Sequence, residues 1–169
     1  MRLFLSLFMC VGAQAASVPS VSLEELVDQS AAIVHGRVAR SWAAWDSAHK
    51  YIWTHHLITV IDPVRGGEAG FVVASEPGGE LDGVGMKFSG TLEYAVGEET
   101  IVFLYRAPIG YLRATGLGQG KYTVTSELRV RINLKGLDLL PRNTGLSTLN
   151  GLTIADFKAR VREAIGRRR

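Results

Sequence analysis

The sequence predicts a mainly β domain with one helix before the sheet and one after it. Short β-rich runs recur between residues 33 and 134, with turn residues between them. Two stretches have the apolar spacing of a helix, and each starts at a capping residue. Dense glycines at 76–97 lead into an apolar run at 101–105, which we expect to be a strand buried on both faces.

The first 15 residues have the three parts of a secretory signal peptide. Arg2 gives a positive start, an apolar stretch covers 3–12, and Ala-Gln-Ala at 13–15 is a small-residue cleavage site. The apolar stretch is shorter than the roughly 20 residues of a spanning helix. We therefore expect export, to the periplasm or beyond, after cleavage near Ala15, with no transmembrane segment in the mature protein.

Cleavage changes what composition implies. The only cysteine, Cys10, leaves with the signal, so the mature chain contains no disulfide. Acylation of Cys10 is the alternative, although Met9 stands where that processing prefers a small residue. Residues 16–157 carry twelve basic and fifteen acidic side chains, whereas six basic side chains lie in 158–169. A mildly acidic body lacks the clustered Lys and Arg of a nucleic-acid-binding face, so we expect no nucleic-acid partner.

The elements follow one another in a single domain. After a linker at 16–21, Ser22 and Glu25 form a capping box for a helix that should end near Ser30. Residues 22–135 make up the β domain with this leading helix, with an Asp-Pro stop expected at 62–63. A long loop, 136–152, precedes a C-terminal amphipathic helix with a basic tail, 153–169. The expected strands cover 33–38, 51–61, 71–74, 101–105, 111–114 and 128–134, and 41–50 is a loop or a strand extension.

No motif for catalysis or for a cofactor is complete. His55 and His56 are adjacent on a strand and point to opposite faces, so they cannot ligate one ion. The G-L-G-Q-G-K run at 116–121 does not match a phosphate loop. Thr115 stands at the position of the first glycine of that motif, and Tyr122 stands at the position of the Ser or Thr that binds magnesium. A G-x-S-x-G nucleophile motif is absent from the sequence. We expect no cofactor and no metal, and a protein that is not an enzyme.

Several motifs carry a family resemblance. Residues 28–38, DQSAAIVHGRV, resemble the opening of many small exported bacterial proteins. Across most of 22–126 the chain resembles one uncharacterised family of such proteins, which implies export but no activity. The motifs that carry this resemblance are PGG at 77–79, GVGM at 83–86, SG at 89–90, GEE at 97–99, VFL at 102–104 and GLGQGKY at 116–122.

A more distant similarity connects the element order to netrin-like domains and tissue inhibitors of metalloproteinases. It implies an OB-like, partly open β-barrel flanked by an N-terminal helix and a C-terminal helix. Those inhibitors chelate the protease zinc through an N-terminal cysteine. Here the mature chain should begin at Ala16 or Ser17 and contains no cysteine, so the inhibitory mechanism does not carry over.

The function expected from these observations is a non-catalytic interaction module for a protein or cell-envelope ligand. One version is a partner or inhibitor of an exported metalloprotease. A hydrolase or metal-binding enzyme that uses the loop carboxylates is one alternative. Another is an envelope-surface protein held by Arg167, Arg168 and Arg169. The candidate binding residues on the loop face are Glu76, Gly78, Gly79, Glu80, Asp82, Met86, Gln119 and Lys121.

Overall fold

The structure, a computed structural model, describes residues 16–67, 69–135, 137–140 and 145–167. The expected signal peptide, Arg168 and Arg169 lie outside the described residues, and so does part of the expected long loop, 141–144.

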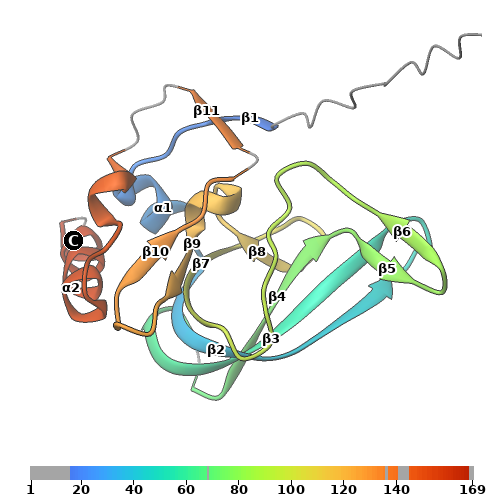
Figure 1. Ribbon diagram of the computed structural model, residues 1–169, viewed down its shortest axis with the longest axis horizontal. Coiled ribbons are helices and arrows are strands. Elements are labelled where there is room, and N and C mark those ends of the chain that lie inside the picture. Colours follow the sequence, from blue (N-terminus) through green and yellow to red (C-terminus); the bar gives the residue numbers. More distant parts are fainter. Residues whose placement is uncertain (1–15, 68, 136, 141–144, 168–169) are drawn as a thin grey trace, which may run out of the picture.

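The mainly β fold is confirmed, and its main sheet closes on itself (Figure 1). Seven strands follow the order β10-β9-β7-β2-β3-β4-β8, and β8 pairs again with β7. Strands β2, β3, β4, β8 and β7 therefore form a ring. The strands of this sheet are β2 (Ala32–Trp45), β3 (Ile52–Arg65), β4 (Phe71–Pro77), β7 (Glu99–Arg106), β8 (Leu112–Ala114), β9 (Lys121–Val124) and β10 (Val130–Ile132).

The longest hairpin, β2–β3, extends past both of its expected limits. The first strand continues through the 41–45 segment to Trp45, because Ser41 to Trp45 pair residue for residue with β3. The Asp62-Pro63 stop expected for the second strand is wrong, since β3 continues to Arg65. Proline lacks a ladder N–H and is tolerated at bulges. Pro63 sits beside a register shift between Ile33 and Val34, where that missing donor is accommodated.

The strand expected at 128–134 is shorter than its alternation suggested. β10 covers only Val130–Ile132, and Leu128 lies in a turn with a φ of 57°. The Leu128 N–H donates to the Thr125 carbonyl at 2.9 Å, which closes this turn between β9 and β10. Leu128 is consequently an exposed side chain, not part of the core.

Two smaller sheets lie in segments expected to be loops. β1 (Ala16–Pro19), within the expected linker, pairs in parallel with β11 (Leu137–Leu140), within the expected long loop. β5 (Gly79–Leu81) and β6 (Val84–Met86) form a hairpin within the glycine-rich stretch. Two 3-10 helices, η1 (Leu117–Gly120) and η2 (Leu146–Leu149), complete the irregular segments.

Both expected helices are present and pack on the same side of β7. α1 (Leu23–Gln29) is capped by Ser22 with the complete capping box, and α2 (Ile154–Gly166) is capped by Thr153. β7 separates two cores, as the buried strand expected at 101–105 requires. Ile101 and Phe103 pack toward the helices, whereas Val102 and Leu104 face the inside of the ring.

The ring is weakest where β4 meets β8. Among the described residues these strands share one register pair, Ala74↔Leu112. The next link is a side chain: Glu76, only 1% exposed, accepts a hydrogen bond from the Ala114 N–H at 2.9 Å. Arg113 approaches the same carboxylate at 3.5 Å. We call this junction the β4–β8 seam.

Replacing Glu76 with alanine should weaken the seam. The Ala114 N–H would stay buried without an acceptor, and a void would replace the carboxylate. We expect a loss of about 2–3 kcal/mol in the free energy of unfolding, measured by urea denaturation. Glu76→Gln keeps an acceptor oxygen and should lose less.

The matched control is Glu80→Ala, which removes an exposed carboxylate of the neighbouring hairpin. It should change stability by no more than about 0.5 kcal/mol. A Glu76→Ala protein as stable as this control would contradict the role given to the carboxylate.

Candidate functional site

The first candidate residues of the glycine-rich stretch shape the chain. The carboxylate of Glu76 is buried in the seam. Gly78 and Gly79 have φ values of 101° and 136°. A Cβ on Gly78 would lie 2.8 Å from the Met86 carbonyl oxygen, and one on Gly79 would lie 2.5 Å from Thr54 Oγ1. Close backbone passage explains these glycines without a ligand.

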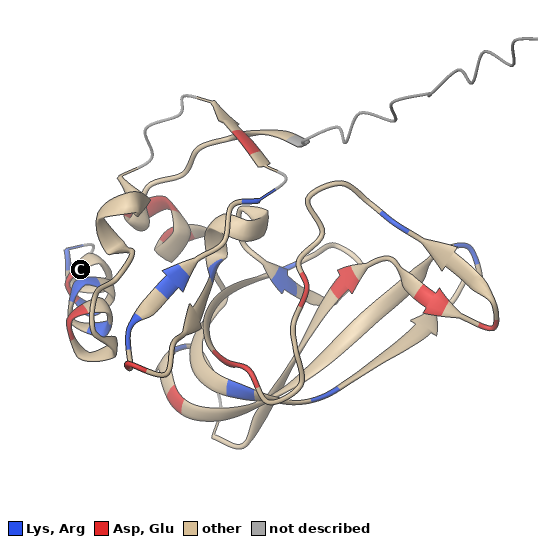
Figure 2. Cartoon of the chain, viewed as in Figure 1, with Lys and Arg blue, Asp and Glu red and all other residues tan. Residues whose placement is uncertain are grey.

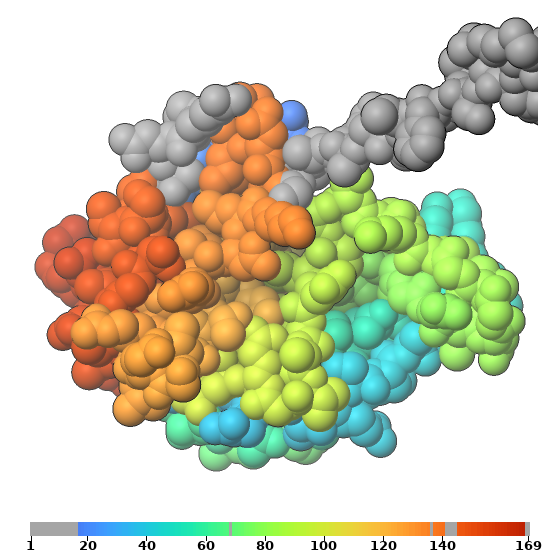
Figure 3. All heavy atoms as spheres, in the orientation of Figure 1, coloured from blue at the N-terminus to red at the C-terminus, as the bar shows by residue number. Residues whose placement is uncertain are grey.

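Glu80, Asp82 and Met86 belong to the β5–β6 hairpin. In Figures 1 and 3 this hairpin forms a lobe at the opposite end of the molecule from α2. Glu80 and Asp82 are exposed. The Met86 sulfur accepts a hydrogen bond from the Ile52 N–H at 3.4 Å, which holds the hairpin against β3.

Gln119 and Lys121 are buried and serve other parts of the fold. Gln119 Oε1 accepts from the Val21 N–H at 2.9 Å, and Nε2 donates to the Pro19 carbonyl at 3.0 Å. Lys121 Nζ lies 2.7 Å from the Glu98 carboxylate. The structure therefore does not bring the eight candidate residues to one face. The exposed ones lie together on the hairpin, and the others make internal contacts.

A polar cluster occupies the inside of the ring. The His56 ring packs on the Tyr94 ring with centroids 4.4 Å apart, and Lys121 Nζ lies 4.5 Å from the same tyrosine ring centroid. His56 Nδ1 is 2.8 Å from Ser41 Oγ. Burial, with a contribution from the charge of Lys121, lowers the pKa of His56 to about 4. Burial also raises the pKa of Tyr94 well above its usual range.

Each histidine has a protein contact of its own. Among the described residues there is no group of three or more His, Cys, Asp or Glu side chains placed to hold a metal ion. The contacts are His35 with Glu99 at 2.8 Å, His49 stacked on Trp45, His55 with Ser75 at 2.8 Å, and His56 with Ser41.

A groove of about 510 Å³ runs beside the seam. One wall is the start of β4, with Phe71 and Val73, and the other is the β7–β8 connection, with Arg106 and Tyr111. Ser75, further along β4, also lines the groove and is 2% exposed. We call this feature the seam groove. No Asp or Glu is among the described residues that line it, so Arg106 gives it a positive charge.

Aromatic rings continue from the seam groove across the outer surface of the sheet. His55, which lines the groove, lies 5.3 Å from both Trp42 and Tyr111 between ring centroids. Tyr111 is in turn 5.1 Å from Trp53. Burial lowers the pKa of His55, which favours its neutral form at neutral pH.

Sequence reasoning missed this groove. It interpreted His55 as structural and residues 107–110 as a hairpin loop; the hairpin is confirmed by the antiparallel pairing of β7 with β8, but neither interpretation indicated a groove. A usable signal was present on the long strand, where Trp53, His55 and Leu57 alternate onto one face with Tyr51 before them. Their neighbours Phe71 and Tyr111 come from distant segments, and no local pattern connects those segments.

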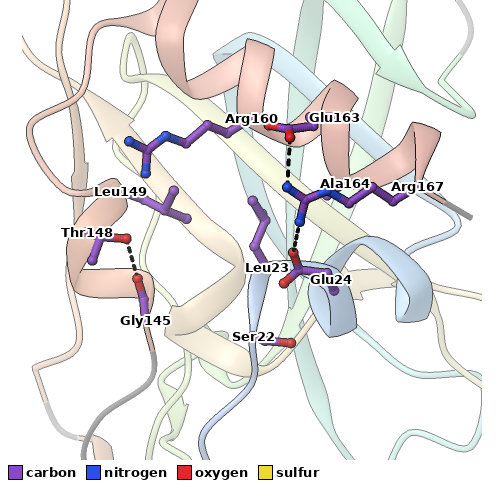
Figure 4. Close-up of a pocket in the computed structure, with 10 residues that line it drawn as sticks. All are labelled: Ser22, Leu23, Glu24, Gly145, Thr148, Leu149, Arg160, Glu163, Ala164 and Arg167. Atoms are coloured by element: carbon purple, nitrogen blue, oxygen red, sulfur yellow. Dashed lines mark hydrogen bonds and ion pairs between the residues drawn. The ribbon is translucent and has the colours of Figure 1, made fainter.

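A second hollow, of about 360 Å³, lies between α1, η2 and α2 (Figure 4). Its charged side chains largely pair with one another: Arg167 contacts Glu163 at 2.7 Å and Glu24 at 3.6 Å. Figure 2 likewise shows both signs of charge on α2. This hollow lies between the two helices, and of its charged lining residues only Arg160 has no ion pair among the described residues.

Comparison with known proteins adds no family. No family model matches the sequence, and no curated protein matches it. Within the described part of the chain, helices long and apolar enough to cross a membrane are absent.

The low pKa of His56 predicts a loss of stability in acid. The unfolded chain binds this proton near pH 6.5 and the folded protein near pH 4, so between these values the unfolded state holds more protons. Stability is then complete above pH 6.5 and falls as the pH is lowered toward 4. The gap corresponds to about 3 kcal/mol.

Urea unfolding at several pH values checks this expectation. His56→Gln should flatten the dependence between pH 7 and 5, where few carboxylates titrate. Ser41→Ala is the control, because it removes the hydrogen bond to His56 but keeps the imidazole, and it should retain the slope. An unchanged slope in His56→Gln would show that another group is responsible.

Proposed function

We propose that this protein is an exported, non-catalytic binding module whose ligand lies in the seam groove. The observation that carries the proposal is the open groove itself, which has an apolar wall and a cation, Arg106, that forms no ion pair with the described residues. Phe71 is 65% exposed on that wall. A concave site with apolar walls and few polar groups is the usual form of a ligand site.

The proposal takes the ring as an OB-type barrel. In chain order its strands are β2, β3, β4, β7 and β8, and around the ring the third neighbours the fifth while the fourth neighbours the first. The weakly paired seam corresponds to the opening of a partly open barrel. OB-type domains bind on the face of their second and third strands and on the loop between the fourth and fifth. Those elements here are β3, β4 and the 107–111 connection, which border the seam groove.

The side chains that could do chemistry do not converge. The carboxylate of Glu76 is engaged inside the ring, whereas Glu80 and Asp82 lie on the exposed hairpin. In the seam groove, Ser75 and His55 share a hydrogen bond, but the serine is almost fully buried. No carboxylate bonds to His55 among the described residues. A serine nucleophile needs both access and an oriented base, so binding is favoured over hydrolysis.

Export is the second part of the proposal and depends on the expected signal peptide at residues 1–15. An exported domain of this length can fold without disulfides, because it is large enough to bury two apolar clusters. The ligand would then be a component of the cell envelope or of the exterior.

Site-specific photocrosslinking tests the binding function and does not require an identified ligand. A benzophenone amino acid replaces Phe71 in one variant and Ile109, beside the groove, in another. Each folded variant is irradiated in an envelope extract of the native host. We expect both to form crosslinked products, and unlabelled wild-type protein should compete them away.

Two control positions match these in exposure. Leu128 is 62% exposed against 65% for Phe71, and Leu140 is 57% exposed against 56% for Ile109. Neither lines the groove. Products that form equally at all four positions, or at none, would contradict a ligand site in the seam groove.

A further inference from the structure

We propose that the ligand of the seam groove is an extended acidic peptide, which binds by adding a strand along the open edge of β4 at Phe71 and Val73. The inference rests on the proposed binding function and names its ligand class. Three independent features of the groove carry it: the direction of the β4 backbone, the faces that line the groove, and the distribution of charge.

The backbone of β4 turns hydrogen-bonding groups toward the groove. The Val60 N–H donates to the Gly70 carbonyl and the Gly78 N–H donates to the Ile52 carbonyl, which sets the phase of the β3–β4 ladder. Peptide groups alternate in direction along an antiparallel strand. Val72 and Ala74 therefore bond to β3, whereas the peptide groups of Phe71 and Val73 point away from it.

Beyond the register pair at Ala74, that side of β4 has no strand partner among the described residues. β8 runs parallel to β4 and begins only at Leu112, opposite Ala74. The stretch from Phe71 to Val73 precedes this point. Because Ala74 bonds to β3, its register pair with Leu112 is made through the Val73 carbonyl and the Ser75 N–H. The N–H and carbonyl of Phe71 and the N–H of Val73 remain as an open strand edge of the kind that accepts a peptide by strand addition.

The residues that line the groove show that it follows this edge. Phe71 and Val73 face outward from the ring, while Val72 faces the inner core together with Ala32. Arg106 and residues 110–112 line the groove from the other side, so it lies between the start of β4 and the β7–β8 segment, along the side of β4 that faces away from β3.

The charge of the groove selects the peptide. Arg106 lines it, carries no ion pair among the described residues, and bonds only to the Gly110 carbonyl at 3.2 Å. A carboxylate on the ligand would complete a charge-assisted pair with this guanidinium. Alternate side chains of the added strand would meet the apolar Ala32 and Val72, so we expect apolar and acidic residues to alternate.

Selection from a phage library of random hexapeptides, with the folded mature protein as bait, tests the inference. We expect enriched sequences to combine β-branched residues with Asp or Glu at alternate positions. A representative peptide is then synthesised, and its affinity is measured by fluorescence anisotropy. Two versions of the peptide are then made, one methylated on the odd-numbered backbone nitrogens and one on the even-numbered nitrogens. One version should bind at least tenfold more weakly, because it has lost the N–H groups that point toward β4.

Charge reversal at Arg106 tests whether this residue binds the acidic side chains of the peptide. Arg106→Glu should weaken the acidic peptide at least tenfold and favour the analogue in which Lys replaces the acids. Arg131→Glu is the matched control: it makes the same charge change on an exposed position of β10, away from the groove, and should leave binding unchanged.

An oligomer of uronic acid serves as the competing ligand class. If it binds in place of the peptides, or if selection yields no acidic sequences, the peptide inference is overturned, while crosslinking at Phe71 and Ile109 would still support a binding site. If backbone methylation in both registers leaves affinity unchanged, strand addition is overturned. Failure of both the selection and the crosslinking would overturn the proposed function as well.

Discussion

Closure of the five-stranded ring depends on one buried carboxylate. Where β4 and β8 stop exchanging backbone hydrogen bonds, Glu76 accepts from the Ala114 N–H and continues the ladder with a side chain. Burial raises the pKa of Glu76 because the charged form loses its hydration, while the Ala114 N–H and Arg113 favour the charged form. Closure of the ring therefore requires the burial of an acid, whose carboxylate takes the place of the backbone carbonyl that would accept this hydrogen bond in a regular ladder.

This closure also produces the groove. β8 pairs antiparallel with β7 and parallel with β4, and the 107–111 connection is the turn of the β7–β8 hairpin. Because β8 is only three residues long, it meets β4 at a single register pair and leaves the start of β4 without a strand partner among the described residues. The Glu76 carboxylate links the two strands at one end of the junction, and at the other end the groove separates β4 from the 107–111 connection. Seam and groove are thus two consequences of one strand arrangement.

Local features of this fold could be predicted from the sequence, and long-range ones could not. The capping box of α1 is made by residues three positions apart, and the burial of β7 on both faces is indicated by its own continuous apolar run; both are present. Gln119 resembled part of a glycine loop, yet its partner Val21 lies 98 residues away. Glu76 likewise resembled a loop acid, because nothing near it in sequence indicates Ala114. Pairings of this kind are set by topology, which spacing does not encode.

The treatment of other edges argues that the open edge of β4 has a purpose. At the far end of the same sheet, Val130 of β10 exchanges hydrogen bonds with Leu152 and Gly151, so the chain covers that edge with its own segment. Unpaired edges promote aggregation, and proteins usually cover or charge them. The start of β4 instead carries the largely exposed Phe71, and among the described residues that line the groove the charged one is Arg106. An edge that is left open, with an apolar side chain beside it and the Arg106 guanidinium across the groove, is suited to a strand from another molecule.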